Sequence, residues 1–372
     1  MIIVRLIPDK NSKYHFGEGN LFETSLIFHS NSLFSTIINN LGMLYGNRFI
    51  ENNINELKNI KISSLFPAIY QFKKEDVKNE EDIENEILFI PKPMIRLGFD
   101  KDTQKEIENE PKTIKKIKFI SLESLKLHNK KKLKKIVLDK NYLITEKERN
   151  DFNYKNPQNI KLFSRILEQK VTIDRIKNTT LDIDGTGQLY SVEYIKPLGK
   201  KDKKTKMENK VGFYFILDFN GLEDENIKKK ILSAINFIKD EGIGGKRRIG
   251  YGNFKNIIIG NKYKNTNLED VFKNKGDLNY TSLSITLPKD KKEFESFETY
   301  GLSKIGGYIY TTTKIQKIGD KLKNTVYAIS EGSVCNRRIE GKICSLKPKN
   351  APHDIILNGK PVLLPIKVFN EW

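Results

Sequence analysis

Hydrophobic and polar positions near the N-terminus predict a strand followed by an amphipathic helix. Residues 2–7 are a run of mostly aliphatic side chains, which Pro8 ends because proline cannot extend a sheet ladder. Between residues 33 and 45, apolar side chains recur with i, i+3/i+4 spacing, which is typical of a helix with one buried face. Ser30 and Asn31 precede this stripe, so we expect their side-chain oxygens to cap the helix.

Further along the chain, the pattern predicts a β-hairpin and a second helix. Two runs, 171–176 and 189–195, alternate between apolar and polar side chains and are separated by turn residues, which is typical of a hairpin. A helix with one apolar face begins at about Asp224 and ends at Gly242. Other predicted strands cover residues 65–72, 87–95, 211–219 and 257–259.

The order of these elements indicates the fold. Without insertions it is strand, helix, strand, strand, helix, strand, which is the ferredoxin-like pattern. Residues 98–160 are polar and rich in lysine, so we interpret them as an insertion. After residue 265 the pattern changes to short strands with little helix. These strands are expected at 283–287, 308–310, 326–329 and 361–366.

We therefore predict an α+β protein with two units. Residues 1–265 would form a modified ferredoxin-like (RRM-like) domain that carries an insertion at about 98–160, a hairpin at about 171–195 and a glycine-rich loop at 242–252. Residues 266–372 would form a second, β-rich unit that is a degenerate version of the same fold. With 372 residues, the chain is long enough for two packed units.

The charge balance points to a class of partner. The chain has 66 Lys and Arg residues against 47 Asp and Glu residues, a formal net charge of +19. Such an excess favours a polyanion, because basic side chains that neutralise phosphates release condensed counterions. Part of it could instead reflect a composition rich in Lys, Ile and Asn, as AT-rich genomes encode. The lysine-rich stretch 112–135 likewise has two interpretations, a face that follows RNA or a solvated helix surface.

Several other classes of protein are disfavoured. No apolar run approaches the roughly 20 residues that a membrane-spanning helix needs, and the first residues lack the basic region of a signal peptide. We therefore expect a cytoplasmic protein with no membrane partner. Cys335 and Cys344 form no CxxC pair and belong to no Cys/His cluster, so we expect neither a disulfide framework nor a zinc site. No motif indicates a cofactor.

The glycine-rich loop is the most informative segment. Its glycines alternate with Lys246, Arg247 and Arg248 directly after a helix. Glycine lets backbone N–H groups approach an anion closely while the cations surround it, so phosphate is the natural ligand. The loop matches neither the Walker A nor the GxGxxG pattern, which excludes the common nucleotide-binding loops. The alternative interpretation is a glycine-rich helix end with solvated cations.

A second candidate lies at the start of the first helix, where His29 stands beside Ser30. His29 is the obvious candidate for a catalytic base, but the sequence places no second histidine or carboxylate beside it to orient the ring. We therefore interpret His29 as a residue that contacts phosphate, and we assign no catalytic residue and no metal site. In the second unit, Glu-Gly-Ser-Val at 331–334 with Arg337 nearby is either a phosphate contact or a plain surface turn.

Together these segments resemble the RAMP superfamily of CRISPR proteins, whose modified ferredoxin-like domains end in a glycine-rich loop placed as 242–252 is. Within that superfamily, the chain looks like the subunit that binds the 5′ handle of the guide RNA in the type III-A (Csm) complex. One departure is Asn31, where the family usually has Asp, so any role for a carboxylate there is lost. The likeness spans nearly the whole chain and rests on residues 16–18, 28–35, 173–176, 187–190, 244–252 and 331–334.

The resemblance implies a non-catalytic subunit of an RNA-guided effector complex in antiviral defence. The loop and the helix start would hold the repeat-derived 5′ tag of the guide RNA (crRNA), and the hairpin at 171–195 would act as a thumb that crosses the guide duplex. The β-rich half would dock the large polymerase-like subunit, the backbone RAMP subunit would be a second partner, and target RNA would be contacted indirectly. The expected RNA-binding residues are His29, Ser30, Arg175, Gly244, Gly245, Lys246, Arg247, Arg248, Tyr251, Ser333 and Arg337.

Two alternatives stay open. A RAMP-type, metal-independent endoribonuclease that processes CRISPR repeat RNA would share the fold and the loop, with His29 as the base for attack of a 2′-OH on the adjacent phosphate. A general basic RNA-binding protein would show no sequence preference and no stable copurifying partners. Incubation with repeat RNA in EDTA distinguishes the nuclease from a binding subunit.

Overall fold

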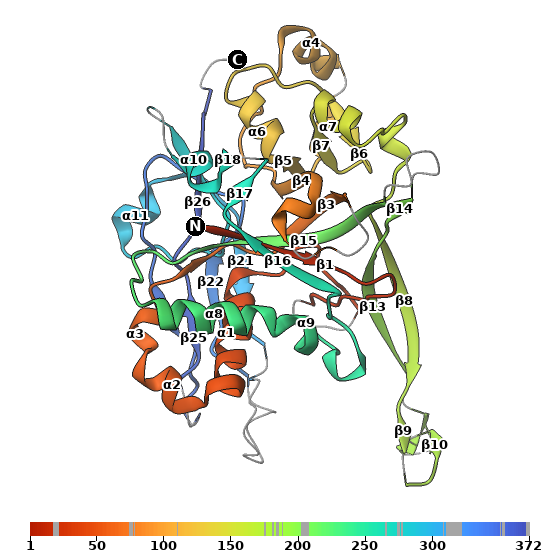
Figure 1. The fold of residues 1–372 in the computed structure, drawn as a ribbon, viewed down its shortest axis with the longest axis vertical. Coiled ribbons are helices and arrows are strands. Elements are labelled where there is room, and N and C mark those ends of the chain that lie inside the picture. Colours follow the sequence, from red (N-terminus) through yellow and green to blue (C-terminus); the bar gives the residue numbers. More distant parts are fainter. Residues whose placement is uncertain are drawn as a thin grey trace.

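A central sheet runs through the molecule, and a long hairpin projects to one side (Figure 1). Two of the helices, α1 (Ser30–Tyr45) and α8 (Glu225–Asn236), lie on one side of this sheet, and short strands of the C-terminal half lie behind it. The computed structural model of the chain describes residues 1–372 except 18–21, 74–76, 78, 110, 175, 181, 184–185, 188, 202–207, 265, 274–275, 277, 308, 310–321, 350, 352–353 and 370–372.

The central sheet has the ferredoxin-like strand order. β1 (Ile2–Ile7) lies between β15 (Glu208–Asp218) and β16 (Asn256–Gly260), and β15 pairs on its other side with β3 (Phe66–Phe72). Neighbouring strands in this group are antiparallel. Numbered along the chain as β1, β3, β15 and β16, the strands therefore lie in the order 4-1-3-2. The predicted α+β, ferredoxin-like architecture is confirmed.

Two main helices cover one face of this sheet, close to where the pattern predicts them. α1 (Ser30–Tyr45) presents the predicted apolar stripe to the core. α8 (Glu225–Asn236) begins after Asp224, whose carboxylate accepts hydrogen bonds from backbone N–H groups of the first turn. The chain continues through α9 (Ile238–Glu241) and leaves the helix at Gly242, where φ is 70°.

The cap predicted for α1 is wrong. The N-cap residue is His29, and no side chain forms a capping hydrogen bond there. Ser30 Oγ instead accepts a hydrogen bond from the backbone N–H of Ile285 at 3.0 Å. Asn31 Oδ1 is buried without a hydrogen-bond partner among the described residues. The C-terminal half of the chain therefore uses the hydroxyl group that local sequence would assign to the helix.

Alternation along the strands divides the core into two layers. Val4 and Phe213 face the helices, whereas their neighbours Ile3 and Tyr214 face the C-terminal half. The first layer includes Leu33, Phe34, Ile37 and Leu41 of α1 with Ile227, Ile231 and Ile235 of α8. The second layer includes Leu283, Val334, Val362, Leu364 and Ile366. The central sheet is therefore buried on both faces.

Residues 98–160 extend the central sheet. β3 pairs with β4 (Ile83–Pro91), which pairs with β5 (Phe119–Ser121). The sheet continues with β7 (Tyr142–Ile144) and β6 (Ile136–Leu138). Apolar side chains of the lysine-rich stretch 112–135 join the second core layer, so this stretch is partly buried. Its helices are α4 (Lys101–Asn109), α5 (Pro111–Lys115), α6 (Leu122–His128) and α7 (Glu146–Asp151).

The hairpin begins earlier in the chain than predicted. β8 (Phe163–Val171) pairs antiparallel with β13 (Leu189–Pro197), from Phe163 opposite Pro197 to Val171 opposite Leu189. Of the strand predicted at 171–176, only Val171 pairs with β13, and Ile173–Asp174 form a separate short strand, so the predicted pairing of the whole run with 189–195 is wrong. Because β8 is half-buried on one face and exposed on the other, it lacks the strongly apolar positions that mark a core strand. At the far end of the hairpin lie β9 (Ile173–Asp174), β10 (Thr179–Thr180), β11 (Asp182–Ile183) and β12 (Thr186–Gly187), as Figure 1 shows for β9 and β10.

The C-terminal half repeats the strand order in degenerate form. β19 (Asn279–Ser282), β20 (Phe297–Thr299), β23 (Val334–Cys335) and β26 (Leu363–Ile366) lie in the order β20-β23-β19-β26, which is again 4-1-3-2 when read from β26. α11 (Lys291–Glu295) connects the first two strands. β24 (Ile343–Ser345) and β25 (Ile356–Asn358) form a hairpin between β23 and β26, at the position that the second helix of a ferredoxin-like fold occupies. The prediction of a degenerate, β-rich second unit is confirmed.

The individual strands predicted in this half have mixed outcomes. Those at 326–329 and 361–366 correspond to β22 (Val326–Ile329) and β26, and β22 pairs with β21 (Leu302–Ile305). The strand predicted at 283–287 is wrong, because the pairing residues are 279–282. Of 308–310, only Ile309 lies within the described residues.

The remaining short elements are α2 (Asn47–Asn52), α3 (Ile54–Leu57), β2 (Lys61–Ile62), β14 (Lys200–Lys201), β17 (Lys262–Tyr263), β18 (Thr266–Asn267) and α10 (Leu268–Phe272).

Candidate nucleic-acid interface

The glycine-rich loop packs directly against the segment that follows β1. A Cβ atom at Gly244 would lie 2.6 Å from the backbone oxygen of His15, and one at Gly245 would lie 2.8 Å from the His15 ring. A Cβ atom at Gly252 would overlap the backbone of Ile243. Gly244 and Gly252 also have φ values of 82° and 86°, which glycine adopts at little cost. Glycine is therefore needed here because two parts of the chain touch.

Several backbone N–H groups of the loop are already used. Gly245 N–H donates to the backbone oxygen of His15 at 2.8 Å, and Gly252 N–H donates to that of Lys13 at 2.8 Å. The expectation that the loop glycines present their N–H groups to a phosphate is therefore wrong for these two residues. An anion at this loop would be held mainly by side-chain cations.

Lys246 brings the loop against the hairpin near the outer end of the β8–β13 ladder. Lys246 has a left-handed backbone, with φ of 61°, and precedes a 3-10 turn at Arg247–Ile249. Its ammonium group lies 4.9 Å from the centre of the Tyr190 ring on β13, a cation–π distance. Arg248 is exposed and Arg247 is half-buried. The loop thus brings positive charge to the surface where it meets the hairpin.

Tyr251 joins the loop to the hairpin. Its hydroxyl group donates to Glu168 Oε2 on β8 at 2.9 Å. Its ring meets the Tyr194 ring of β13 edge-on, with 5.6 Å between the centres. Burial, together with the hydrogen bond to Glu168, raises the pKa of Tyr251 to about 12. Tyr251 was predicted to contact RNA, but the structure places its buried ring inside the contact between loop and hairpin.

A groove of about 560 Å³ opens between the loop and the hairpin. Two further cations, Lys13 and Lys170, lie in it at 3.4 and 3.5 Å from Glu168 Oε2. Beside them stand the half-buried Tyr190 and the exposed Ile249. Cations beside aromatic and apolar side chains are the chemistry that holds single-stranded nucleic acid. The complete lining is Asn11, Lys13, Glu168, Lys170, Val171, Tyr190, Ile249, Gly250 and Tyr251.

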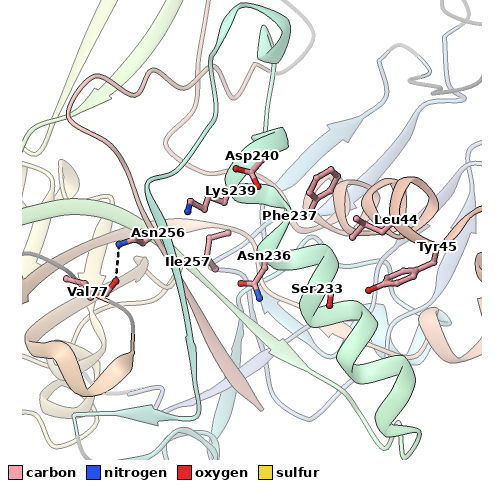
Figure 2. A pocket seen from close by; sticks show the side chains of 10 residues that line it. All are labelled: Leu44, Tyr45, Val77, Ser233, Asn236, Phe237, Lys239, Asp240, Asn256 and Ile257. Carbon is pink, nitrogen blue, oxygen red and sulfur yellow. Dashed lines mark hydrogen bonds between the residues drawn. The ribbon is translucent and has the colours of Figure 1, made fainter.

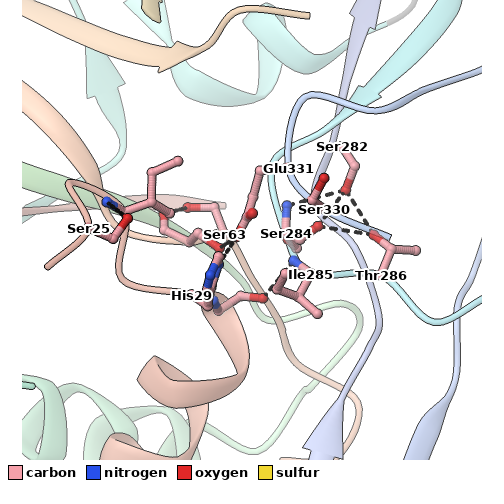
Figure 3. A network of polar contacts seen from close by, with 12 residues as sticks. Ser25, His29, Ser63, Ser282, Ser284, Ile285, Thr286, Ser330 and Glu331 are labelled. Carbon is pink, nitrogen blue, oxygen red and sulfur yellow. Dashed lines mark hydrogen bonds and ion pairs between the residues drawn. The ribbon is translucent and has the colours of Figure 1, made fainter. Parts of the chain in front are cut away.

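At the start of α1, a buried carboxylate from the C-terminal half orients His29. His29 Nδ1 lies 2.8 Å from Glu331 Oε1, and Ser64 Oγ donates to the same oxygen. Figure 3 shows His29 and Glu331 pointing toward each other beside a polar network that includes Ser284 and Thr286. Burial alone would raise the pKa of Glu331, but the charge of His29 and the hydrogen bonds from His29 and Ser64 outweigh burial and lower it.

The other predicted site residues lie apart from the groove. Ser30 and Ser333 are buried, and Ser333 Oγ donates to a backbone oxygen of its own turn at 2.7 Å. Arg337 is exposed, and its guanidinium group donates to the backbone oxygen of Lys292. Arg175 lies outside the described residues. Among the described residues, the structure therefore places the loop residues beside the hairpin, His29, Ser30 and Ser333 near the joint between the two halves, and Arg337 on the surface of the C-terminal half.

A second cavity of about 560 Å³ lies between the end of α1, the turn from α8 to α9, and β16 (Figure 2). Its charged side chains are Lys239 and Asp240, and none of the predicted site residues lines it. A hydrogen bond of 3.0 Å from Asn256 Nδ2 to the backbone oxygen of Val77 crosses one side of it. We therefore regard the groove at the hairpin as the stronger candidate.

Two properties of the described residues bear on other functions. No group of three or more His, Cys, Asp or Glu side chains within them could hold a metal ion. In the same part of the chain, no helix is long and apolar enough to cross a membrane.

Sequence reasoning missed several residues at both places. Lys13, Glu168, Lys170 and Tyr190 come together only because β1 and the hairpin converge on the loop. The available signal was the even spacing of Glu168 and Lys170, and of Tyr190 and Tyr194, which places each pair on one face of a strand. The segment 331–334 was noticed in the sequence, but nothing in it indicates that Glu331 contacts His29, because the two residues stand 302 positions apart.

Comparison with known proteins covers the whole chain. The RAMP superfamily model matches residues 12–255, and the model of the CRISPR Csm4 C-terminal domain matches residues 275–366. The chain is 37% identical over 399 residues to the CRISPR system Cms protein Csm4 of Methanocaldococcus jannaschii, covering 98% of this chain and 97% of that protein. It is 25% identical to the protein of the same name from Streptococcus thermophilus, covering 95% and 96%.

Solved structures agree with this assignment. A chain of the Csm3-Csm4 subcomplex in the type III-A CRISPR-Cas interference complex matches with a TM-score of 0.64 and 30% identity, covering 99% of this chain and 100% of that one. A chain of the Csm1-Csm4 cassette in complex with cA4 shares the fold at a TM-score of 0.53 and 15% identity, covering 100% and 99%. The chain therefore belongs to the RAMP superfamily and, within it, to the Csm4 family of subunits of type III-A Csm effector complexes.

Proposed function

We propose that the chain is a non-catalytic subunit that binds the repeat-derived 5′ tag of the guide RNA. The observation that carries this proposal is the groove between the glycine-rich loop and the hairpin, where Lys13 and Lys170 stand beside Tyr190. The loop cations Lys246 and Arg248 extend the positive surface next to it. Cations position RNA through its phosphates, and exposed rings and apolar side chains support its bases.

The outer face of the hairpin supports a role as a thumb. Leu167, Val171 and Leu189 are 61, 40 and 65% exposed, and Val171 stands directly opposite Leu189 in the ladder. These side chains share the face that turns away from Tyr251, because residues of a strand alternate between faces. Apolar side chains on a projecting hairpin can stack against bases, so we propose that the hairpin crosses the guide duplex.

The proposed partners follow from the solved relatives, which were crystallised with Csm3 and with Csm1. We propose that this chain contacts the backbone RAMP subunit and the large polymerase-like subunit, and that it reaches target RNA only through the guide. The C-terminal half exposes Tyr300, Leu302 and Tyr327. An apolar group of this kind favours a protein partner on the β-rich half.

The test is purification of the tagged full-length chain from its host, followed by identification of the bound protein and sequencing of the bound RNA. We expect both partner subunits and RNAs that share one repeat-derived 5′ tag. A synthetic RNA with this tag should then bind more tightly than one with the tag scrambled. Recovery of mixed cellular RNA without partners, and equal affinity for both RNAs, would instead identify a general basic RNA-binding protein.

The contact between His29 and Glu331 favours a second candidate, a metal-independent ribonuclease. A buried carboxylate holds the imidazole in a fixed orientation, as a general acid or base requires. The test is incubation of the full-length chain with repeat RNA in EDTA, beside the His29→Ala variant. We expect neither protein to cleave the RNA. Cleavage by the wild type that is lost in His29→Ala would replace the binding subunit with the nuclease.

A further inference from the structure

One charge in the groove is unsuited to phosphate binding. Glu168 presents a carboxylate among the lysines, and its side chain is 38% exposed. The hydrogen bond from Tyr251 is the main reason that the pKa of Glu168 is lowered. Burial opposes this shift, and Lys13 and Lys170 add to the lowering. The group is therefore ionised at neutral pH and would repel a phosphate placed next to it.

The contacts of this carboxylate are concentrated on one oxygen. Tyr251 donates to Oε2 at 2.9 Å, and the ammonium groups of Lys13 and Lys170 lie 3.4 and 3.5 Å from the same atom. Within the described part of the chain, these three contacts all go to Oε2. The second oxygen, Oε1, can therefore accept a hydrogen bond from a ligand while Oε2 keeps the side chain in place.

The walls of the groove suit a nucleobase. The Tyr190 ring lies on β13 beneath the ammonium group of Lys246, and Ile249 on the loop is 54% exposed. Base stacking on such side chains tolerates any base, because every base has a flat π-face. The volume of about 560 Å³ lies within the range of pockets that hold small ligands.

We propose that this groove holds one unpaired nucleotide of the tag and that Glu168 recognises its base, an inference that rests on the proposed function. The phosphate lies on the N–H donors of Lys13 and Lys170 that point away from Glu168, because each ammonium group has three donors. The base lies between Tyr190 and Ile249. Glu168 accepts a hydrogen bond from an exocyclic amino group. Adenine, cytosine and guanine carry such a group, whereas uracil has none, and its N3–H lies between two carbonyl oxygens that the carboxylate repels.

The experiment measures the affinity of the full-length chain, in the assembly that copurifies with it, for oligo(A), oligo(C) and oligo(U) of equal length. The wild type should prefer oligo(A) and oligo(C) over oligo(U) by about fivefold. In Glu168→Gln, affinity for oligo(U) should rise because a negative charge is removed, and the preference should fall to about one. The amide of glutamine both donates and accepts, so it no longer discriminates against a carbonyl group.

Glu193→Gln is the matched control, because it removes the same charge from the other face of the hairpin. Glu193 Oε2 accepts hydrogen bonds from Thr24 N–H at 2.8 Å and from Arg165 at 3.2 Å. This variant should keep the preference for oligo(A) and oligo(C). Thermal unfolding of each variant shows whether the hairpin is still docked.

Three results would overturn the inference: a wild type without preference, an unchanged preference in Glu168→Gln, or an equal loss of affinity for every RNA in that variant. The last of these would show that Glu168 only holds Tyr251 in place. None of them affects the comparison of tagged with scrambled RNA, so failure of this inference and failure of the proposed function are distinguishable.

Discussion

At the scale of single residues, Gly250 and Gly252 separate two reasons for glycine in the loop. Their φ values are nearly equal, 85° and 86°. A Cβ atom at Gly250 would meet nothing within 4 Å, whereas one at Gly252 would overlap the backbone of Ile243. Replacement of Gly250 therefore adds only backbone strain. Replacement of Gly252 adds the same strain and also separates two segments that are in contact.

We expect Gly250→Ala to lower the free energy of unfolding by about 1 kcal/mol, which is the usual cost of a left-handed backbone for a residue with a Cβ atom. Gly252→Ala should cost about 3 kcal/mol or more, because the overlap with Ile243 must also be relieved. Denaturant unfolding of both variants measures the difference. Equal losses would show that the loop does not need this close contact.

The loop also shows what sequence can predict at this scale. Its place after a helix and its three cations are local features, and the structure has both. The use of its N–H groups could not be predicted, because Lys13 and His15 reach the loop only through the pairing of β1 with β16. Ser30 was misassigned for the same reason, since its partner Ile285 is distant in sequence.

At the scale of elements, His128 fastens the end of α6 to the C-terminal segment. Gly98 N–H donates to His128 Nδ1 at 2.7 Å, and Nε2 lies 2.9 Å from the backbone oxygen of Lys367. Nδ1 must therefore accept and Nε2 must donate, which requires the neutral ring. Burial lowers the pKa of His128 to about 4, and the hydrogen bond to Lys367 opposes this shift only in part.

This burial predicts a pH dependence of stability. The unfolded chain binds a proton at His128 near pH 6.5, but the folded chain does so only near pH 4. Stability from this residue is therefore complete above pH 6.5 and is lost as pH falls toward 4, by about 3 kcal/mol. Unfolding of the wild type and of His128→Gln from pH 7.5 to pH 4 measures it. The stability advantage of the wild type should shrink over this range, and a constant advantage would mean that His128 titrates alike in the folded and unfolded chain.

The elements differ in how well their patterns reveal them. β1, α1 and α8 were predicted close to their bounds. The two helices each bury one face, which gives a clear helical spacing of apolar side chains, and β1 is a nearly continuous buried apolar run. β8 was placed too late in the chain, because the hairpin projects into solvent and buries little of either face. Strands of 2 to 4 residues, such as β23 and β19, are too short to show a period at all.

At the scale of the molecule, the two halves meet through a polar joint as well as an apolar core. Glu331 reaches from the C-terminal half to His29 and Ser64, and it is buried. The β-rich character of the second half could be predicted from its short apolar runs. The joint could not, because its partners are brought together only by the packing of one sheet on the other.

We expect Glu331→Gln to lower the free energy of unfolding by about 2 kcal/mol or more, because it leaves His29 and Ser64 without their buried carboxylate. Glu340→Gln is the matched control. Its side chain is 74% exposed and pairs with Lys289 at 2.9 Å, so water takes the place of the carboxylate and stability should change little. A loss of stability no larger in Glu331→Gln than in the control would show that the joint does not hold the halves together.

Our central proposal is that the glycine-rich loop holds RNA through its phosphates, and the salt dependence of binding tests this proposal most directly. Neutralising Lys246, Arg247 and Arg248 together should weaken binding to tagged and scrambled RNA alike. It should also flatten the plot of log affinity against log salt by roughly one unit for each phosphate that the loop no longer neutralises. Neutralising three exposed lysines of the C-terminal half, Lys273, Lys291 and Lys292, should leave the slope nearly unchanged. An unchanged affinity and slope in the loop variant would contradict this proposal and show that the loop only ends a helix.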